Sequence, residues 1–136
     1  KALEVAEENA LQNGVRQKIE FRESDLFSCL DRGREKYDII VSNPPYIAED
    51  EIQRLQREVR DYEPALALNG GRDGLDFYKR ITAEAPEFLK PGGMLFLEAG
   101  YGQAHIIAEM MRKKFNDIRI IPDLSHIDRV VTGKRL

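Results

Sequence analysis

Residues 37–46 have the sequence YDIIVSNPPY, a β-branched run that stops at two consecutive prolines. The run Tyr37–Val41 predicts a strand that is buried on both faces of a parallel sheet. In open α/β sheets, ligands bind at the edge formed by the carboxyl ends of the strands. The tetrapeptide Asn43-Pro44-Pro45-Tyr46 follows this strand directly, so it stands where a functional site is expected.

The rest of the chain predicts strands that alternate with helices, with Gly, Pro and Asn between them. We expect helices over residues 1–13, 49–62, 73–89 and 103–115, and strands over residues 19–22, 94–98, 118–121 and 129–132. In the third helix, Asp73 is expected to cap the amino end and Pro86 to introduce a kink. This alternation is typical of a doubly wound α/β sheet. The segment between the last two strands is too short for a crossover helix, so they are expected to pair as an antiparallel hairpin at one edge.

The composition fits one globular domain in a reducing compartment. Of the 136 residues, 42% are hydrophobic and one is a cysteine, which suits a modest core and excludes an internal disulfide. No apolar run approaches the roughly 18 residues of a membrane helix, so we expect a cytoplasmic protein without a membrane partner. The net charge of -3 argues against nucleic acid as a direct substrate. The chain begins without Met and already in a helical pattern, which predicts that it starts inside a longer parent sequence.

The tetrapeptide has the features of a rigid acceptor site for a planar NH2 group. Two successive prolines fix two φ angles and remove two amide donors, so the turn presents carbonyl oxygens without competing N–H groups. The Asn43 side-chain oxygen and the Pro44 carbonyl are expected to accept the two N–H bonds of a substrate, while the Tyr46 ring covers its face. Acceptors placed out of the amide plane favour the pyramidal nitrogen that attack on a methyl sulfonium requires. The alternative is a rigid strand-to-loop turn with no catalytic role.

Further short blocks accompany the tetrapeptide. They are Val41-Ser42, Ile47, Tyr62-Glu63-Pro64, Ala67-Leu68, Gly70-Gly71, Asp73-Gly74-Leu75, Pro91-Gly92-Gly93, Leu97-Glu98 and Asp128-Arg129-Val130-Val131. Together with the tetrapeptide, these blocks resemble the peptide chain release factor glutamine methyltransferases, over most of the chain from Asp25 onward. The tetrapeptide alone is shared with N6-adenine DNA methyltransferases. It therefore indicates the reaction class, and the later blocks indicate the subfamily.

The resemblance implies a fold, a reaction and a partner. The fold is the Rossmann-like class I S-adenosylmethionine-dependent methyltransferase fold without its first two strands, and residues 1–136 are the C-terminal portion of the catalytic domain. The reaction is transfer of a methyl group from S-adenosyl-L-methionine, without a metal, to the side-chain amide nitrogen of a glutamine. The expected protein partners are peptide chain release factors.

The resemblance also assigns site residues. Asn43, Pro44 and Tyr46 are expected to be catalytic, and together with Pro45 they are expected to hold the substrate glutamine. The donor contacts that it implies are Asp25 and Leu26, beside the adenine, and Asn43. At the end of a strand, a carboxylate such as Asp25 can accept a hydrogen bond from an exocyclic amine. From spacing alone, a cap for the turn at Leu26 is an equal alternative.

Two features depart from the family pattern. The glycine-rich donor loop and the acidic residue that binds the ribose are both absent, and both would precede Lys1. The stretch Gly70–Gly74 is rich in glycine but follows no strand, so it is interpreted as substrate-loop structure and not as a replacement. His126 stands near a position where relatives commonly carry Gly. Neither His105 nor His126 is expected to be catalytic.

Two other functions are left open by the sequence. The first is an N6-adenine nucleic-acid methyltransferase, which would predict a basic cleft or a separate DNA-reading domain. The second is a fragment that does not bind the donor and acts only as a protein-binding domain. Titration with the methyl donor separates this second function from an active enzyme.

Overall fold

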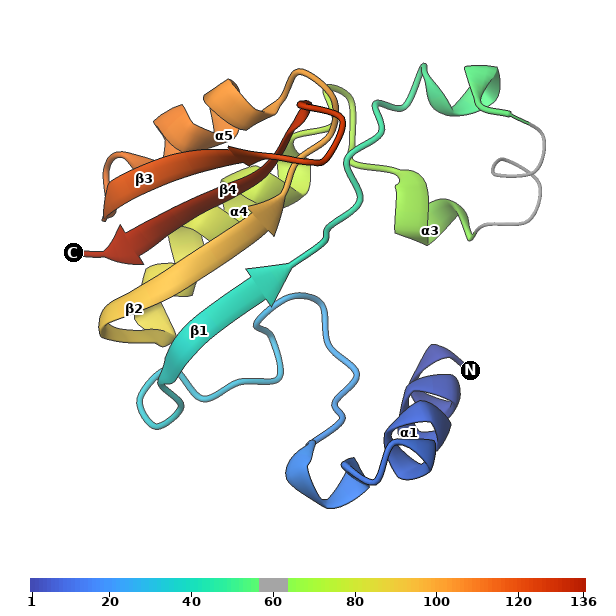
Figure 1. The fold of residues 1–136 in the computed structure, drawn as a ribbon, viewed down its shortest axis with the longest axis vertical. Coiled ribbons are helices and arrows are strands. Elements are labelled where there is room, and N and C mark those ends of the chain that lie inside the picture. The colour runs from blue at the N-terminus through green and yellow to red at the C-terminus, as the bar shows by residue number, and fades with distance from the viewer. Residues whose placement is uncertain (57–63) are drawn as a thin grey trace. The chain divides into compact units, whose positions relative to one another are not determined.

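The computed structural model describes residues 1–56 and 64–136. They form two compact units, Lys1–Asp31 and Arg32–Leu136, and Figure 1 colours the chain from blue at the N-terminus to red at the C-terminus. Among the described residues, no helix has the length and apolar composition needed to cross a membrane.

The first unit begins with a helix that ends as predicted. Helix α1, Ala2–Gln12, is followed by Asn13, whose side-chain N–H donates to the Asn9 carbonyl at 2.8 Å. Gly14 then takes a φ of 67°, a left-handed conformation that glycine adopts without the clash of a Cβ. A 3-10 turn follows at Arg16–Lys18. The predicted helix over residues 1–13 is thus confirmed.

The predicted strand over residues 19–22 is wrong. These residues have no regular secondary structure, and Ile19 is 40% exposed. Alternating apolar and polar residues form a strand only where a neighbouring strand supplies hydrogen-bond partners. The described residues of the first unit contain no such strand, so the pattern has nothing to pair with.

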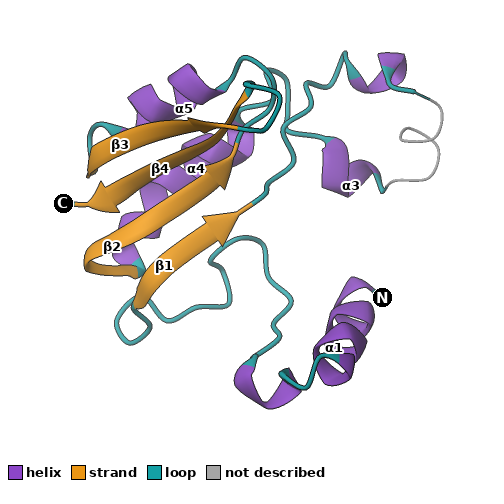
Figure 2. Cartoon of the chain, viewed as in Figure 1, coloured by secondary structure: helices purple, strands orange, loops and turns teal. Residues whose placement is uncertain are grey.

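The second unit is built on a mixed sheet, four strands of which lie in the described residues (Figure 2). They are β1 (Tyr37–Ser42), β2 (Leu89–Glu98), β3 (Phe115–Pro122) and β4 (Asp128–Arg135). Their order across the sheet is β1-β2-β4-β3. β1 and β2 run parallel, whereas β4 is antiparallel to both β2 and β3. The predicted α/β architecture and C-terminal antiparallel hairpin are confirmed.

Two helices, α4 (Asp76–Glu84) and α5 (Ala104–Met111), cover one face of this sheet (Figure 1). Four apolar residues of α4 and of the turn that follows it are buried, and they are Tyr78, Ile81, Ala85 and Phe88. The core also includes strand residues that are 0% exposed, namely Leu95, Leu97 and Val131. Burial of these large apolar side chains stabilises the packing of the helices on the sheet.

The two ends of α4 differ from the prediction. Asp73 does not cap the helix, because its carboxylate accepts a hydrogen bond from the Leu75 N–H at 3.0 Å and so closes the turn that precedes the helix. At the other end, α4 gives way to a 3-10 turn at Ala85–Glu87. Pro86 accounts for the change, since it has no N–H for a hydrogen bond to the carbonyl four residues earlier.

Strand β1 has its predicted place but not its predicted burial. Tyr37, Ile39 and Val41 are 36%, 57% and 75% exposed. Within the described residues β1 pairs only with β2, and these three side chains lie on the sheet face opposite to the buried Leu95 and Leu97. Two-sided burial was therefore a wrong prediction, because it needs a second neighbouring strand and a cover for this face.

The chain between β1 and α4 leaves the sheet. It contains a 3-10 turn at Ile52–Arg54 and the short helix α3, Ala65–Leu68. The predicted helix over residues 49–62 is wrong where it is described, since residues 55 and 56 follow the 3-10 turn without helical structure. Helices of this length depend on packing of an apolar face, and this segment is mostly charged. Residues 57–62 of the prediction lie outside the described residues.

The hairpin between β3 and β4 turns around Asp123. Its carboxylate accepts hydrogen bonds from the backbone N–H groups of Ile127 at 3.1 Å and Ser125 at 2.8 Å. Hydrogen bonding from Ile127 and Ser125 lowers the pKa of Asp123. His126 lies within this turn with a φ of 61°, which gives a physical reason why glycine suits the position.

Candidate functional site

The tetrapeptide Asn43–Tyr46 leaves the sheet at the carboxyl end of β1 (Figure 1). The residue before it, Ser42, pairs with Leu97 of the parallel strand β2, so the tetrapeptide begins beside Glu98, where β2 ends. Parallel strands meet at one edge of the sheet with their carboxyl ends, and ligands bind there in open α/β sheets. The tetrapeptide therefore lies at the sheet edge that the sequence predicted.

The four residues of the tetrapeptide differ in exposure. Pro44 is buried, Pro45 and Tyr46 are half-buried, and Asn43 is exposed. Within the described residues, the Asn43 side chain makes no hydrogen bond to the protein. The turn thus combines a buried support with an exposed amide whose oxygen is available to a ligand.

The Tyr46 side chain reaches the end of β2. Its hydroxyl donates to Glu98 Oε1 at 3.5 Å, which is long for a hydrogen bond. On the core side, the hydroxyl of the buried Tyr78 donates to the Glu98 carbonyl at 2.7 Å. Burial raises the pKa of Tyr78, so this hydroxyl keeps its proton and remains a donor at neutral and alkaline pH. The Glu98 backbone is therefore fixed by a hydrogen bond from the core side of the sheet.

The chain that follows Tyr46 is fixed to the glycine-rich stretch. The Ile47 N–H donates to the Leu68 carbonyl at 3.0 Å, and the Gly70 N–H donates to the Ile47 carbonyl at 2.9 Å. A Cβ on Gly70 would lie 2.8 Å from the Tyr46 Cα and 2.9 Å from the Gly74 Cα, a distance at which only glycine fits. The stretch Gly70–Gly74 thus supports the tetrapeptide directly.

The sequence did not single out two neighbours of the tetrapeptide, Glu98 and Gln103. Glu98 was noted only as part of a family block, and Gln103 only as the start of a helix. Their hydrogen bonds to Tyr46 join positions that are 52 and 57 residues apart, so no local pattern indicates them. A long polar residue at the end of a buried strand or at the start of a helix was the only available signal.

The predicted adenine contacts, Asp25 and Leu26, lie in the first unit. The turn there is closed by two serines, because Ser24 Oγ accepts from the Cys29 N–H at 3.1 Å and Ser28 Oγ accepts from the Asp25 N–H at 3.2 Å. Leu26 has a φ of 51°, which is uncommon for leucine and persists where the surrounding structure imposes it. The role of both residues in donor binding stays a prediction.

A family model described as the methyltransferase small domain matches residues 1–72. This match covers more than half of the 136 residues and includes the whole tetrapeptide Asn43–Tyr46. The chain belongs to the methyltransferase small domain family.

This member of the methyltransferase small domain family is similar to curated proteins that are named release factor glutamine methyltransferases. It is 43% identical to the release factor glutamine methyltransferase of Koribacter versatilis (strain Ellin345) over 134 residues, which cover 98% of the chain and 46% of that relative. It is 47% identical to the release factor glutamine methyltransferase of Geobacter sulfurreducens, with the same coverage of 98% and 46%. The chain thus spans about half the length of these relatives.

A solved structure supports the fold. The chain superposes on a methyltransferase from Pyrococcus furiosus with a TM-score of 0.58 and 21% sequence identity, over 96% of the chain and 58% of that structure. At this identity the likeness concerns the architecture. It agrees with the α/β architecture described above.

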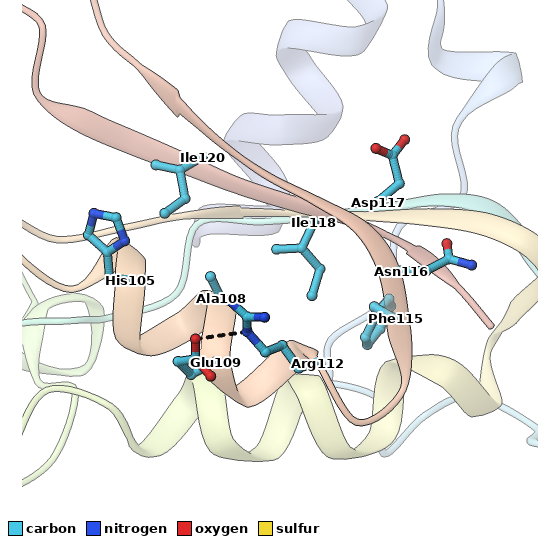
Figure 3. A pocket seen from close by; sticks show the side chains of 9 residues that line it. All are labelled: His105, Ala108, Glu109, Arg112, Phe115, Asn116, Asp117, Ile118 and Ile120. Carbon is cyan, nitrogen blue, oxygen red and sulfur yellow. Dashed lines mark ion pairs between the residues drawn. The ribbon is translucent and has the colours of Figure 1, made fainter.

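A hollow of about 550 Å³ lies elsewhere in the second unit, along α5 and β3 (Figure 3). Its charged side chains include Glu109 and Arg112, which pair with each other at 2.8 Å. His105, at its rim, lies 3.5 Å from Asp128. None of the residues predicted to be catalytic or to bind substrate or donor lines this hollow, so it is distinct from the candidate site.

Proposed function

We propose that the full-length protein transfers a methyl group from S-adenosylmethionine to the side-chain amide nitrogen of a glutamine in a peptide chain release factor. The observation that carries this proposal is the exposed Asn43 amide on the buried Pro44 support, at the carboxyl edge of the sheet. The identity of 43–47% to proteins named release factor glutamine methyltransferases supports the choice of substrate.

The proposed mechanism rests on hydrogen-bond acceptors. An amide nitrogen is a weak nucleophile because its lone pair is delocalised into the carbonyl. Asn43 Oδ1 and the Pro44 carbonyl accept the two N–H bonds of the substrate and favour a pyramidal nitrogen, and Pro45 and the Tyr46 ring fix the distance and orientation of approach. No general base is needed before transfer, since the surplus proton can leave the nitrogen afterwards.

We propose that three residues of this chain contact the methyl donor. S-adenosylmethionine supplies an electrophilic methyl group on its sulfonium. The exposed Asp25 carboxylate suits an exocyclic amine of adenine, Leu26 suits the face of the adenine ring, and Asn43 borders the methyl group.

We also propose that residues 1–136 are the C-terminal portion of the catalytic domain. The support is β1, whose Ile39 and Val41 side chains are 57% and 75% exposed although the Ile-Ile-Val run is typical of a central strand. The relatives, of which the chain spans 46%, are long enough to supply further strands. A strand beside β1 would also pair its open edge.

The substrate is tested by offering the full-length protein a release factor and duplex DNA together with radiolabelled S-adenosylmethionine. Label is expected in the release factor, and reactions without the protein give the background. Label confined to the DNA would contradict the proposal and support an adenine methyltransferase. Absence of label from both, with no binding of the donor in calorimetry, would support a protein-binding domain without catalysis.

Replacing Tyr46 with phenylalanine in the full-length protein is expected to lower methyl transfer by no more than about tenfold. The change keeps the ring and removes one long hydrogen bond to Glu98, whose loss corresponds to roughly 0.5–1.5 kcal/mol. Single-turnover rates of the variant and the wild type measure the effect. A fall in the rate by several orders of magnitude would show that methyl transfer depends on the Tyr46 hydroxyl and not on the ring.

A further inference from the structure

Gln103, the residue before α5, connects three separate loops with its side-chain amide. Its Oε1 accepts the Gly100 N–H at 3.1 Å. Its Nε2 donates to the Tyr46 carbonyl at 2.9 Å and lies 3.5 Å from the Gly74 carbonyl. The amide orientation follows from chemistry, because carbonyl oxygens only accept and a backbone N–H only donates.

The three loops meet so closely that the two loops facing Tyr46 each need a glycine, at Gly74 and at Gly100. A Cβ on Gly74 would lie 2.4 Å from the Tyr46 carbonyl oxygen and 2.7 Å from Gln103 Nε2. A Cβ on Gly100 would lie 2.5 Å from Gln103 Oε1 and 2.8 Å from the Tyr46 ring. At both positions an added Cβ would therefore collide with Tyr46 and with the Gln103 amide.

We propose that Gln103 is a positioning residue that fixes the Asn43–Tyr46 turn for substrate binding. β1 holds the turn at its start through the pairing of Ser42 with Leu97. Gln103 holds it at its end through the Tyr46 carbonyl. Between these points, Pro44 and Pro45 have fixed φ angles, so anchoring both ends restricts the backbone of the turn, which carries the Asn43 side chain and the Pro44 carbonyl.

This role rests on the function proposed for the tetrapeptide and deepens it. Gln103 is not assigned a contact with the substrate; it acts through the backbone of Tyr46. Misplacement of a reacting group by about 1 Å can cost on the order of 100-fold in rate. A loosened turn is therefore expected to lower kcat while donor affinity changes little.

Two variants of the full-length protein test the proposal. Gln103→Met keeps the length of the side chain and removes all of its amide hydrogen bonds. Gln103→Glu keeps the acceptor for Gly100 but sets a carboxylate oxygen against the Tyr46 and Gly74 carbonyls. Gln12→Met, at an exposed residue of α1, is the matched control.

The first readout is amide hydrogen exchange, which needs no substrate. In both variants the amides of Ile47 and Gly70, whose hydrogen bonds hold the chain after Tyr46, are expected to exchange at least about tenfold faster. Amides of α4 and β2 should keep their protection. Unchanged exchange at Ile47 and Gly70 would overturn the proposal, and so would a general loss of protection in α4 and β2, which would indicate a merely structural role.

The second readout is methyl transfer from S-adenosylmethionine to a purified release factor. We expect kcat to fall at least about tenfold in Gln103→Met and further in Gln103→Glu, with donor Kd within about twofold of the wild type. Wild-type rates in both variants would overturn the proposal. If the wild type itself transfers no methyl group, the proposed function fails, whereas the exchange result still decides whether Gln103 positions the turn.

Discussion

Replacing Asn43 with alanine in the full-length protein is expected to lower the rate of methyl transfer by about two orders of magnitude or more, the range seen when one preorganised partner of a transition state is lost. The reason is that the exposed Asn43 oxygen is one of the two acceptors proposed to bind the substrate NH2 group. The other acceptor, the Pro44 carbonyl, belongs to the backbone and remains. Donor affinity, measured by calorimetry, should fall much less than the rate.

The matched control is Asn116→Ala, which removes an exposed asparagine side chain beside the hollow of α5 and β3. It is expected to leave both the rate and the donor affinity unchanged. Turnover of Asn43→Ala near that of the wild type would remove Asn43 from the mechanism. A fall in the melting temperature of Asn43→Ala without a fall in rate would leave the residue a structural role alone.

Replacing the acceptor glutamine of the release factor with glutamate is expected to abolish methylation. A carboxylate has no N–H for Asn43 and Pro44 to accept and no nitrogen to methylate, and its charge would face two acceptor oxygens. The measurement is the incorporation of label from S-adenosylmethionine into the wild-type and variant release factors. An unrelated surface glutamine of the same release factor, replaced in the same way, serves as control.

Persistent label in the glutamate variant would show that methylation occurs at another residue. The tetrapeptide would then bind a group other than the glutamine amide, although its two acceptor oxygens suit a planar NH2 group. Equal loss of label in both release factor variants would point to damage of the release factor itself, and not to loss of the acceptor.

The sequence predicted the elements whose signals are local. The run Ile39-Ile40-Val41 predicted where β1 lies, and the helical pattern after Asp73 predicted α4, whose Tyr78 and Ile81 are buried. These succeed because β-branching and helical periodicity act on neighbouring residues. The position of the tetrapeptide followed from β1 by the same local argument.

The sequence failed where the outcome depends on distant partners. The apolar alternation around Ile19 predicts a strand, but in the described residues of its unit there is no strand beside it. The burial of β1 depends on which part of the protein covers its second face. The Ile-Ile-Val run alone does not predict this. Gln103 could not be found, because its role arises from loops 57 and 29 residues away.

The central claim is that Asn43–Tyr46 binds a glutamine side chain by its NH2 group. The most direct measurement is a crystal structure of the full-length protein with S-adenosylhomocysteine and a glutamine-containing peptide from the release factor. We predict that the amide nitrogen lies within hydrogen-bond distance, about 2.7–3.2 Å, of Asn43 Oδ1 and of the Pro44 carbonyl, with the Tyr46 ring over its face. A peptide whose glutamine is seated elsewhere, for example in the hollow along α5 and β3, would contradict the account.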